Sequence, residues 1–181
     1  MTGFKEWTLI CDALGLGQQS IILRKGGIAE GRDGFRFKHD DFLLFPTLFH
    51  EQVSKLKLPP TTRLPVARED GQIEVRFRVQ VEWTRDLTDW EMVQRLAPLH
   101  VWEEAEIEKR FRQDETPAVS LAFVRAARLS QPFIFPDAPA YGGCRSWVKL
   151  PDLPADLTSH PALDDAIHRE RERQVLAVIG E

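Results

Sequence analysis

Residues Ile73 to Trp83 alternate apolar and polar side chains without a break, and no other part of the chain constrains the fold more. The apolar members of this run are Ile73, Val75, Phe77, Val79, Val81 and Trp83. Six apolar residues at a spacing of two predict a strand with one buried face. A second long strand is predicted at Val119–Leu129, where one face would carry Val119, Leu121, Phe123, Arg125, Ala127 and Leu129.

Shorter patterns predict the remaining elements. Strands are expected at Ser20–Arg24, Phe35–His39, Phe42–Phe45 and Ser146–Leu150, and Gln131–Gly143 is expected to be a proline-rich loop. Helical spacing of apolar residues predicts helices at 4–14, 86–96 and 103–112, and from Leu163 to Ile179 within a C-terminal segment 161–179. Thr47 is expected to cap a further helix. This order predicts an α+β fold: a small mixed, mostly antiparallel sheet, or a small barrel, with peripheral helices.

The chain of 181 residues is expected to be a single domain, 1–181, with its core in residues 5–150. No apolar run approaches the roughly 20 residues that cross a bilayer. The first residues, Met1 to Trp7, lack the pattern of a signal peptide, so we expect a cytoplasmic protein that does not associate with membranes. Cys11 and Cys144 are expected to stay reduced.

Charge is unevenly distributed along the chain. The net charge is −4, which argues against non-specific coating of nucleic acid. Residues 20–85 nevertheless carry twelve Lys and Arg against nine Asp and Glu, and residues 86–116 carry four against nine. Arg outnumbers Lys by 17 to 7. Arg suits bidentate contacts to phosphate or carboxylate, although the bias also fits a GC-rich genome.

A basic double-glycine segment, Arg24-Lys25-Gly26-Gly27, follows the first expected strand. Glycine takes a positive φ at little cost, so the amides of such a loop can turn toward an anion. The spacing is not that of a phosphate-binding P-loop. The segment is therefore interpreted either as a phosphate-binding loop or as a turn whose cations are solvated.

A polar cluster follows the strand at Phe42–Phe45. In the expected helix, Thr47, His50 and Glu51 would share one side, with Gln52 beside them. His50 next to Glu51 could act as a general base or proton relay, because histidine changes charge near neutral pH. The alternative is an N-cap threonine with solvent-facing polar neighbours.

Three later residues are further candidates for binding. Arg125 falls on the expected apolar face of its strand, where a cation is costly unless it is paired or lines a cavity. Arg145 and Trp147 lie beside a second double glycine, Gly142-Gly143, and Arg with aromatic residues on a flexible loop suits base stacking or phosphate contact. A bulge at Arg125, or a plain turn anchored by Trp147, is the alternative. We expect this loop and the Ser20–Gln52 stretch to form two walls of one pocket.

Other chemistries find no support in the sequence. There is no C-x-x-C or H-x-x-x-H motif for zinc, no G-x-S-x-G nucleophile elbow, and no G-x-G-x-x-G after a strand. We therefore expect no metal site and no cofactor.

Several short motifs in combination resemble an uncharacterised bacterial family. They are Lys5-Glu6-Trp7, Leu23-Arg24-Lys25-Gly26-Gly27-Ile28 with Glu30, Phe42-Leu43-Leu44-Phe45-Pro46-Thr47 with His50-Glu51-Gln52, His100-Val101-Trp102, Arg125 with Arg128-Leu129, and Tyr141-Gly142-Gly143-Cys144-Arg145-Ser146-Trp147-Val148. The family is domain of unknown function 1802. Some members occur with restriction-endonuclease-like domains of the Mrr type, so the resemblance implies a link to restriction–modification. This chain has no recognisable nuclease segment, so cleavage would require a partner nuclease.

A weaker resemblance concerns the fold. Gly17, Gln19, Ile22 and Arg24 lie at the specified positions of the G-x-K-x-x-E-x-R pattern of ASCH domains, and only the glycine and the arginine match in type. ASCH domains are PUA-like barrels that bind RNA or nucleotides, so the resemblance implies a PUA-like barrel here.

Three functional hypotheses follow. The first is a module that recognises nucleic acid or a nucleotide without catalysis, through Arg24, Lys25, the Gly26 and Gly27 amides, Thr47, His50, Arg125, Arg145 and Trp147. The second is an enzyme acting on a phosphorylated or nucleotide substrate, with His50 and Glu51 as its base. The third is a protein-interaction module that uses the acidic helix at Glu103–Glu108.

Overall fold

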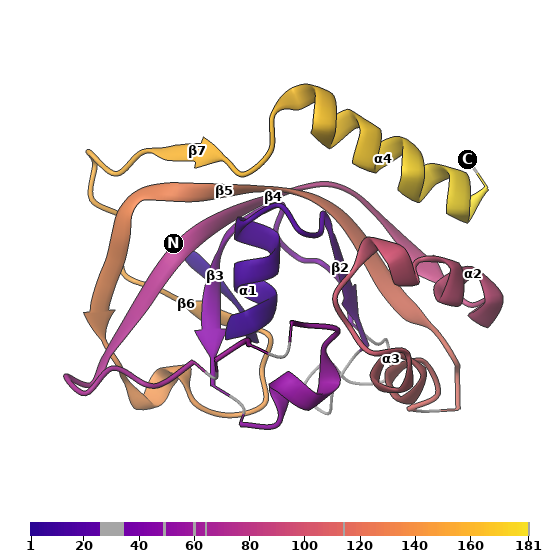
Figure 1. Cartoon of the computed structure of the whole chain (residues 1–181). Helices are drawn as coiled ribbons and strands as arrows, with labels where there is room; N and C mark the ends of the chain where they lie inside the picture. Colours follow the sequence, from indigo (N-terminus) through magenta and orange to yellow (C-terminus); the bar gives the residue numbers. More distant parts are fainter. Residues whose placement is uncertain (26–34, 49, 60, 64, 114, 181) are drawn as a thin grey trace.

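The strand predicted at Ile73–Trp83 is part of β4, Gln72–Leu87, in the computed structural model. The structure describes residues 1–25, 35–48, 50–59, 61–63, 65–113 and 115–180. It pairs antiparallel with β5, Val119–Pro136, along nearly its whole length. Register shifts at Val75/Phe77 and Val81/Trp83 interrupt this ladder. Such irregularities bend a strand, and the two strands form the long arch of Figure 1.

Five further strands complete one sheet. They are β1 (Thr2–Trp7), β2 (Ile21–Arg24), β3 (Asp41–Thr47), β6 (Trp147–Lys149) and β7 (Ser159–Pro161). The strand order is β2-β5-β4-β3-β1-β6, and β7 pairs with β5. Only the β1–β3 pair is parallel among the described pairs. The predicted mixed, mostly antiparallel α+β sheet is confirmed. Among the described strands β2 and β6 are not paired, so the sheet is open rather than a closed barrel.

Four α-helices flank the sheet: α1 (Thr8–Gly15), α2 (Trp90–Arg95), α3 (Glu104–Phe111) and α4 (Asp165–Ile179). Figure 1 shows α1 beneath the arch and α4 along its outer side. Short 3-10 turns are η2 (Gln52–Lys55), η3 (Ala97–Leu99) and η4 (Pro139–Tyr141). Within the described residues, none of the helices has the length and apolar character needed to cross a membrane.

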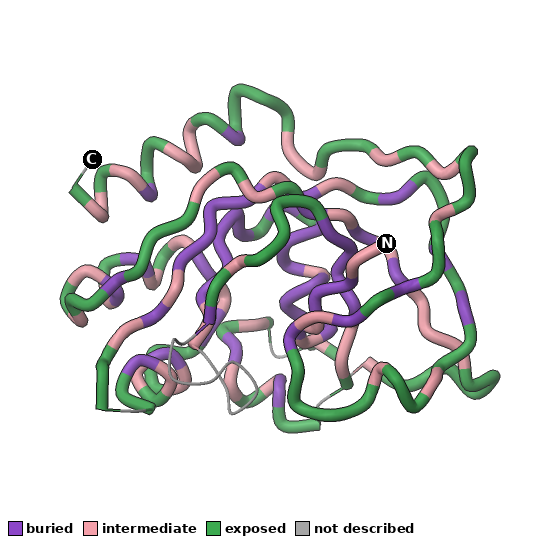
Figure 2. Tube along the Cα trace, turned by 180° about the vertical axis from the view of Figure 1, so that it is seen from behind, coloured by how far each residue is buried: buried purple, intermediate pink, exposed green. Residues whose placement is uncertain are grey.

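The core lies on both faces of β3. Phe42 and Leu44 belong to a large cluster that includes α1, whereas Leu43 and Phe45 belong to a smaller cluster on the other face. A strand buried on both faces reads as a continuous apolar run, which explains Phe42–Phe45. Figure 2 shows the buried residues concentrated in the sheet and the helix beneath it, whereas the buried residues of α4 are His168 and Val175.

The N-terminal helix prediction is wrong for residues 4–7. The apolar spacing from Phe4 to Leu14 suits a helix, but Thr2–Trp7 is β1, and the helix starts only at Thr8. β1 pairs with β3 on one edge and β6 on the other. These partners lie far away in the sequence, and non-local pairing overrode the local helical pattern.

Three other predictions also need correction. Phe35–His39 has no strand assignment, because no described strand pairs with it. Thr47 caps no helix: it is the last residue of β3, which continues through Pro46 and is followed by the 3-10 turn η2. The predicted loop at Gln131–Gly143 is wrong up to Pro136, since β5 continues that far in its ladder with β4.

Candidate functional site

Glu6 places a carboxylate inside the curved sheet. Successive residues of a strand point to opposite faces, and on β1 the buried residues Phe4 and Glu6 share the inner face. Glu6 is 1% exposed. Its Oε1 accepts a hydrogen bond from the Trp7 amide at 2.8 Å, and its Oε2 lies 3.5 Å from Nη1 of Arg24. A buried carboxylate requires partners of this kind, because it has lost its water.

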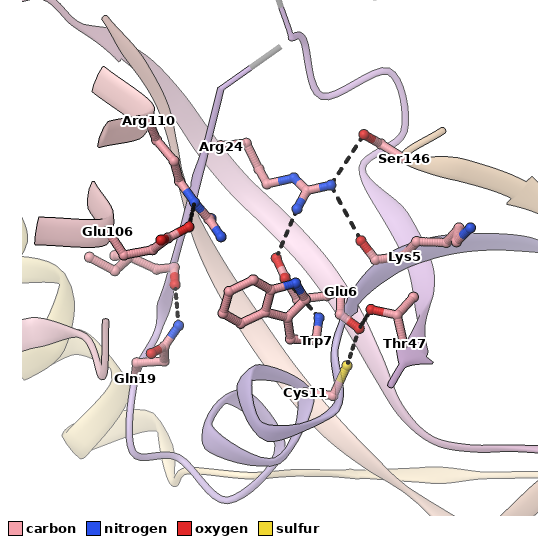
Figure 3. Close-up of polar contacts among 11 residues, drawn as sticks. Lys5, Glu6, Trp7, Cys11, Gln19, Arg24, Thr47, Glu106, Arg110 and Ser146 are labelled. Carbon is pink, nitrogen blue, oxygen red and sulfur yellow. Dashed lines mark hydrogen bonds and ion pairs between the residues drawn. The ribbon is translucent and has the colours of Figure 1, made fainter. Parts of the chain in front are cut away.

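Arg24, the last residue of β2, reaches across the open side of the sheet (Figure 3). Its Nη2 donates to the Lys5 carbonyl at 3.4 Å and to the Ser146 hydroxyl at 3.2 Å. Its Cζ lies 4.9 Å from the centre of the Phe4 ring. Because the guanidinium has five N–H donors and makes three hydrogen bonds, all 3.2 Å or longer, it has capacity for another acceptor. Of the two remaining donors, Nε is buried without a partner among the described residues and the other is on Nη1, and the side chain as a whole is 18% exposed.

Arg110 of α3 is a second cation near Glu6. Its Nε donates to Glu106 at 3.3 Å, and its Cζ lies 3.7 Å from the Trp102 ring centre and 5.3 Å from that of Trp7. Burial lowers the pKa of the Arg110 guanidinium, the Glu6 carboxylate opposes this shift, and the Arg24 cation adds to it. The two arginines therefore share the field of one buried carboxylate.

Backbone contacts hold Glu6 in place. Its carbonyl accepts hydrogen bonds from the Thr47 hydroxyl at 3.0 Å and from the Cys11 thiol at 3.7 Å. Two buried glutamines fix the neighbouring segments, because Gln52 Oε1 accepts from the Leu9 amide and Gln19 Oε1 accepts from the Val101 amide. Figure 3 shows the contacts of the Glu6 carbonyl with Thr47 and Cys11.

The structure brings several predicted residues to this region. Arg24 and Thr47 both contact β1. Trp147 packs its ring 4.8 Å from that of Phe4, and it follows Ser146, the partner of Arg24. The Arg24–Ser146 contact joins the two stretches that were expected to form one pocket. Gly26 and Gly27 lie outside the described residues.

Lys25 and Arg145 lie on either side of this contact along the chain. Lys25 follows Arg24, and its Nζ donates to the Thr116 carbonyl at 2.7 Å. Arg145 precedes Ser146, is exposed, and is close enough to Lys5 to lower the pKa of that ammonium.

Arg125 is not part of this cluster. Its guanidinium donates to Glu82 at 3.2 Å and to Asp165 of α4 at 2.7 Å. The register shift at Val81/Trp83 lies opposite this part of β5, and the residues around Arg125 no longer follow simple alternation. Leu121 to Val124 are all buried, so the predicted apolar face did not identify the surroundings of Arg125.

His50 and Glu51 are exposed residues of the turn before η2. Glu51 lies 3.4 Å from Lys55 in an ion pair. The shared helical side that was predicted for Thr47, His50 and Glu51 is wrong, because Thr47 is in a strand and η2 begins only at Gln52.

Several polar residues of the site were not among the predicted ones: Lys5, Glu6, Gln19, Gln52, Arg110 and Ser146. If Thr2–Trp7 is interpreted as a strand, Glu6 lies on the same face as Phe4. A charged residue on an apolar face indicates a functional or paired position, and this pattern could have identified Glu6 from the sequence. Glu6 was not identified because residues 4–7 were predicted to be part of a helix.

One comparison with known proteins shows the family of this chain. The profile of the family described as "Domain of unknown function (DUF1802)" matches residues 3–174. No curated protein matches the chain. Two solved structures are similar to it: a serine-to-alanine mutant of ZmASCH from Zymomonas mobilis, with a TM-score of 0.47, and ASCH from the same organism, with 0.44. Both are 11% identical to this chain. The alignment with the mutant covers 98% of this chain and 94% of the mutant chain. The alignment with ASCH covers 97% of this chain and 93% of the ASCH chain.

Proposed function

We propose that this chain, which belongs to the DUF1802 family, recognises nucleic acid or a nucleotide through phosphate contacts centred on Arg24. The observation that carries the proposal is the position of Arg24. It spans the open side of the sheet from β2 to Ser146, makes only long hydrogen bonds, and is reachable from solvent. A guanidinium with spare donors is suited to phosphate oxygens.

The charges around Arg24 support an anionic ligand. Lys25 and Arg145 flank the Arg24–Ser146 contact along the chain. The nearby carboxylate of Glu6 is buried and compensates Arg24 and Arg110 from the inside, and the Arg24 side chain remains partly exposed. A positive patch of this kind attracts phosphate and depends on salt.

The role that we propose is recognition without catalysis. Glu51 is exposed and forms its ion pair with Lys55, which does not favour a base built from His50 and Glu51. In the restriction–modification setting that the family resemblance implies, this chain would recognise the nucleic acid and a partner nuclease would cut it.

The test is fluorescence anisotropy with a labelled single-stranded 12-nucleotide DNA or RNA, titrated at a series of salt concentrations. We expect wild-type affinity to fall steeply with salt. Each lost phosphate contact should reduce the slope of log K against log salt by about 0.7. The variants Arg24→Gln and Lys25→Gln should therefore bind more weakly and show a shallower slope.

A charge-matched control for each single variant is Arg128→Gln, since this arginine is exposed and lies on β5 outside the Arg24 cluster. This control should keep the wild-type slope. If Arg24→Gln does not fold, Lys25→Gln still tests whether this region binds phosphate. An absence of oligonucleotide or nucleotide binding by the wild-type protein at low salt would refute the proposal, as would equal losses in Lys25→Gln and the control.

A further inference from the structure

A cleft of about 920 Å³ lies beside the outer face of β1, which carries Lys5. The apolar part of its lining comes from separate segments of the chain, and its side chains include Phe45, Pro46, Leu48, Ile73, Pro139 and Tyr141. A volume of this size is at the upper end of the range of small-molecule sites, which are concave, mostly apolar and oriented by a few polar groups.

Lys5 is a cation of this cleft that makes no ion pair with the carboxylates of the described residues. Its Nζ donates to the carbonyls of Tyr141 at 2.8 Å and Gly143 at 2.9 Å. An ammonium has three donors, so one remains after these two bonds. No carboxylate in the described part of the chain lies within ion-pair distance of Lys5. Burial lowers the pKa of the Lys5 ammonium, and the nearby Asp137 carboxylate opposes this shift without cancelling it.

The other cations of the lining have partners. Arg76 is paired with Asp12 of α1 and lies 3.8 Å from Glu74. Arg68 is paired with Asp70 and Glu74. An acidic group entering the cleft would therefore find its best partner in Lys5, without breaking an existing ion pair.

We propose that this cleft binds a small molecule that combines one acidic group with a flat apolar body. The acidic group, a carboxylate, sulfonate or phosphate, would accept the free donor of Lys5. The flat body would lie against Tyr141, Phe45 and the neighbouring prolines. This site goes beyond phosphate recognition at Arg24, because Lys5 and Glu6 are successive residues of one strand and face opposite sides.

The test uses two fluorescent probes that differ by a single acidic group. The first is 8-anilinonaphthalene-1-sulfonate, and the second is N-phenyl-1-naphthylamine, its uncharged counterpart. Saturable binding of one sulfonate probe per folded chain is expected. Lys5→Met should weaken the sulfonate probe about tenfold, as expected for the loss of a charged hydrogen bond, and should change the uncharged probe less than about twofold.

Two further variants separate the acid contact from the apolar walls. Lys5→Arg retains the charge and should bind the sulfonate probe more tightly than Lys5→Met. Ala138→Phe places a ring in the cleft and should weaken both probes. The exposed Lys149→Gln removes a charge outside the cleft and should change neither.

Equal loss of both probes in Lys5→Met would refute the acid contact, and unchanged binding of both probes in Ala138→Phe would refute the location. Each variant must keep the wild-type thermal unfolding transition, because the sulfonate probe also binds partly unfolded chains. If the wild-type protein binds the probe but no oligonucleotide or nucleotide, the proposal of phosphate recognition at Arg24 is refuted and the cleft proposal is not. The reverse result would refute only the cleft.

Discussion

The guanidinium of Arg24 lies 3.5 Å from the carboxylate of Glu6, although their strands are separated by three others in the sheet. β2 stands at one end of the strand order and β1 next to the other end. The sheet must therefore curve until its two ends approach each other, and this ion pair bridges the opening. Since Glu6 is 1% exposed and Arg24 is 18% exposed, the pair is both a structural tie and the inner part of the proposed phosphate site.

This ion pair should show energetic coupling. Glu6→Gln removes the carboxylate shared by Arg24 and Arg110, and we expect it to cost about 3 kcal/mol. Arg24→Met should also destabilise the fold, because it leaves Glu6 buried without that partner. The double variant should cost at least about 1 kcal/mol less than the sum of the two. Urea unfolding of the four proteins measures this, and strict additivity would contradict the coupling.

Stability should fall in mild acid because of His100. This residue is buried, and burial, with Lys57 as the lesser cause, lowers its pKa from 6.5 to about 3. Between pH 6.5 and 3 the unfolded chain binds a proton that the folded chain does not, so the free energy of unfolding decreases as the pH falls. The contribution approaches about 1.4 kcal/mol per pH unit.

His100→Asn tests this dependence, because the asparagine oxygen can replace Nδ1 as acceptor for the Trp102 amide. Urea unfolding at pH 7.5 and pH 5 should show a smaller loss of stability in this variant than in the wild type. His160→Asn, at an exposed position, controls for the removal of a histidine. Identical losses in wild type and His100→Asn would show that His100 does not contribute.

The two cysteines should differ sharply in reactivity. Both are free; Cys11 is buried and Cys144 is exposed. Burial, followed by the Glu6 carboxylate, raises the pKa of the Cys11 thiol well above its usual value. Reaction with a disulfide reagent at pH 8 should therefore label one thiol per folded chain and two after unfolding. Cys144→Ser should abolish labelling of the folded chain, and rapid labelling in that variant would contradict the burial of Cys11.

Gly15 is required by the close approach of α1 to β4. A Cβ at this position would lie 2.1 Å from the ring of Phe77. Gly15→Ala should therefore destabilise the fold by about 2 kcal/mol, as overpacking does. Phe77→Leu in the same chain should recover part of that loss. Thermal unfolding of the single and double variants provides the measurement, and a neutral Gly15→Ala would show that the helix can shift.

Local sequence patterns predicted Arg24 and the Tyr141–Trp147 loop as parts of the candidate site, but they did not predict Glu6. Both stretches were identified because each combines a double glycine with arginine, and in the structure Arg24 donates a hydrogen bond to Ser146 of the second stretch. Glu6 was missed because a helical spacing of apolar residues fitted the same segment. Arg125 was expected on an apolar face, and its guanidinium is paired with Glu82 and with Asp165, a residue forty positions later in the chain that local alternation could not identify.

The sequence by itself determined the long strands β4 and β5, the helices α3 and α4, and the mixed α+β class. Each of these rests on a periodicity that neighbouring residues carry. Only the tertiary structure decided that Thr2–Trp7 is a strand between β3 and β6, and that Glu6 meets Arg24 across the opening of the sheet. The physical reason is that a period reports which side of an element is buried, whereas pairing depends on partners that lie far away in the chain.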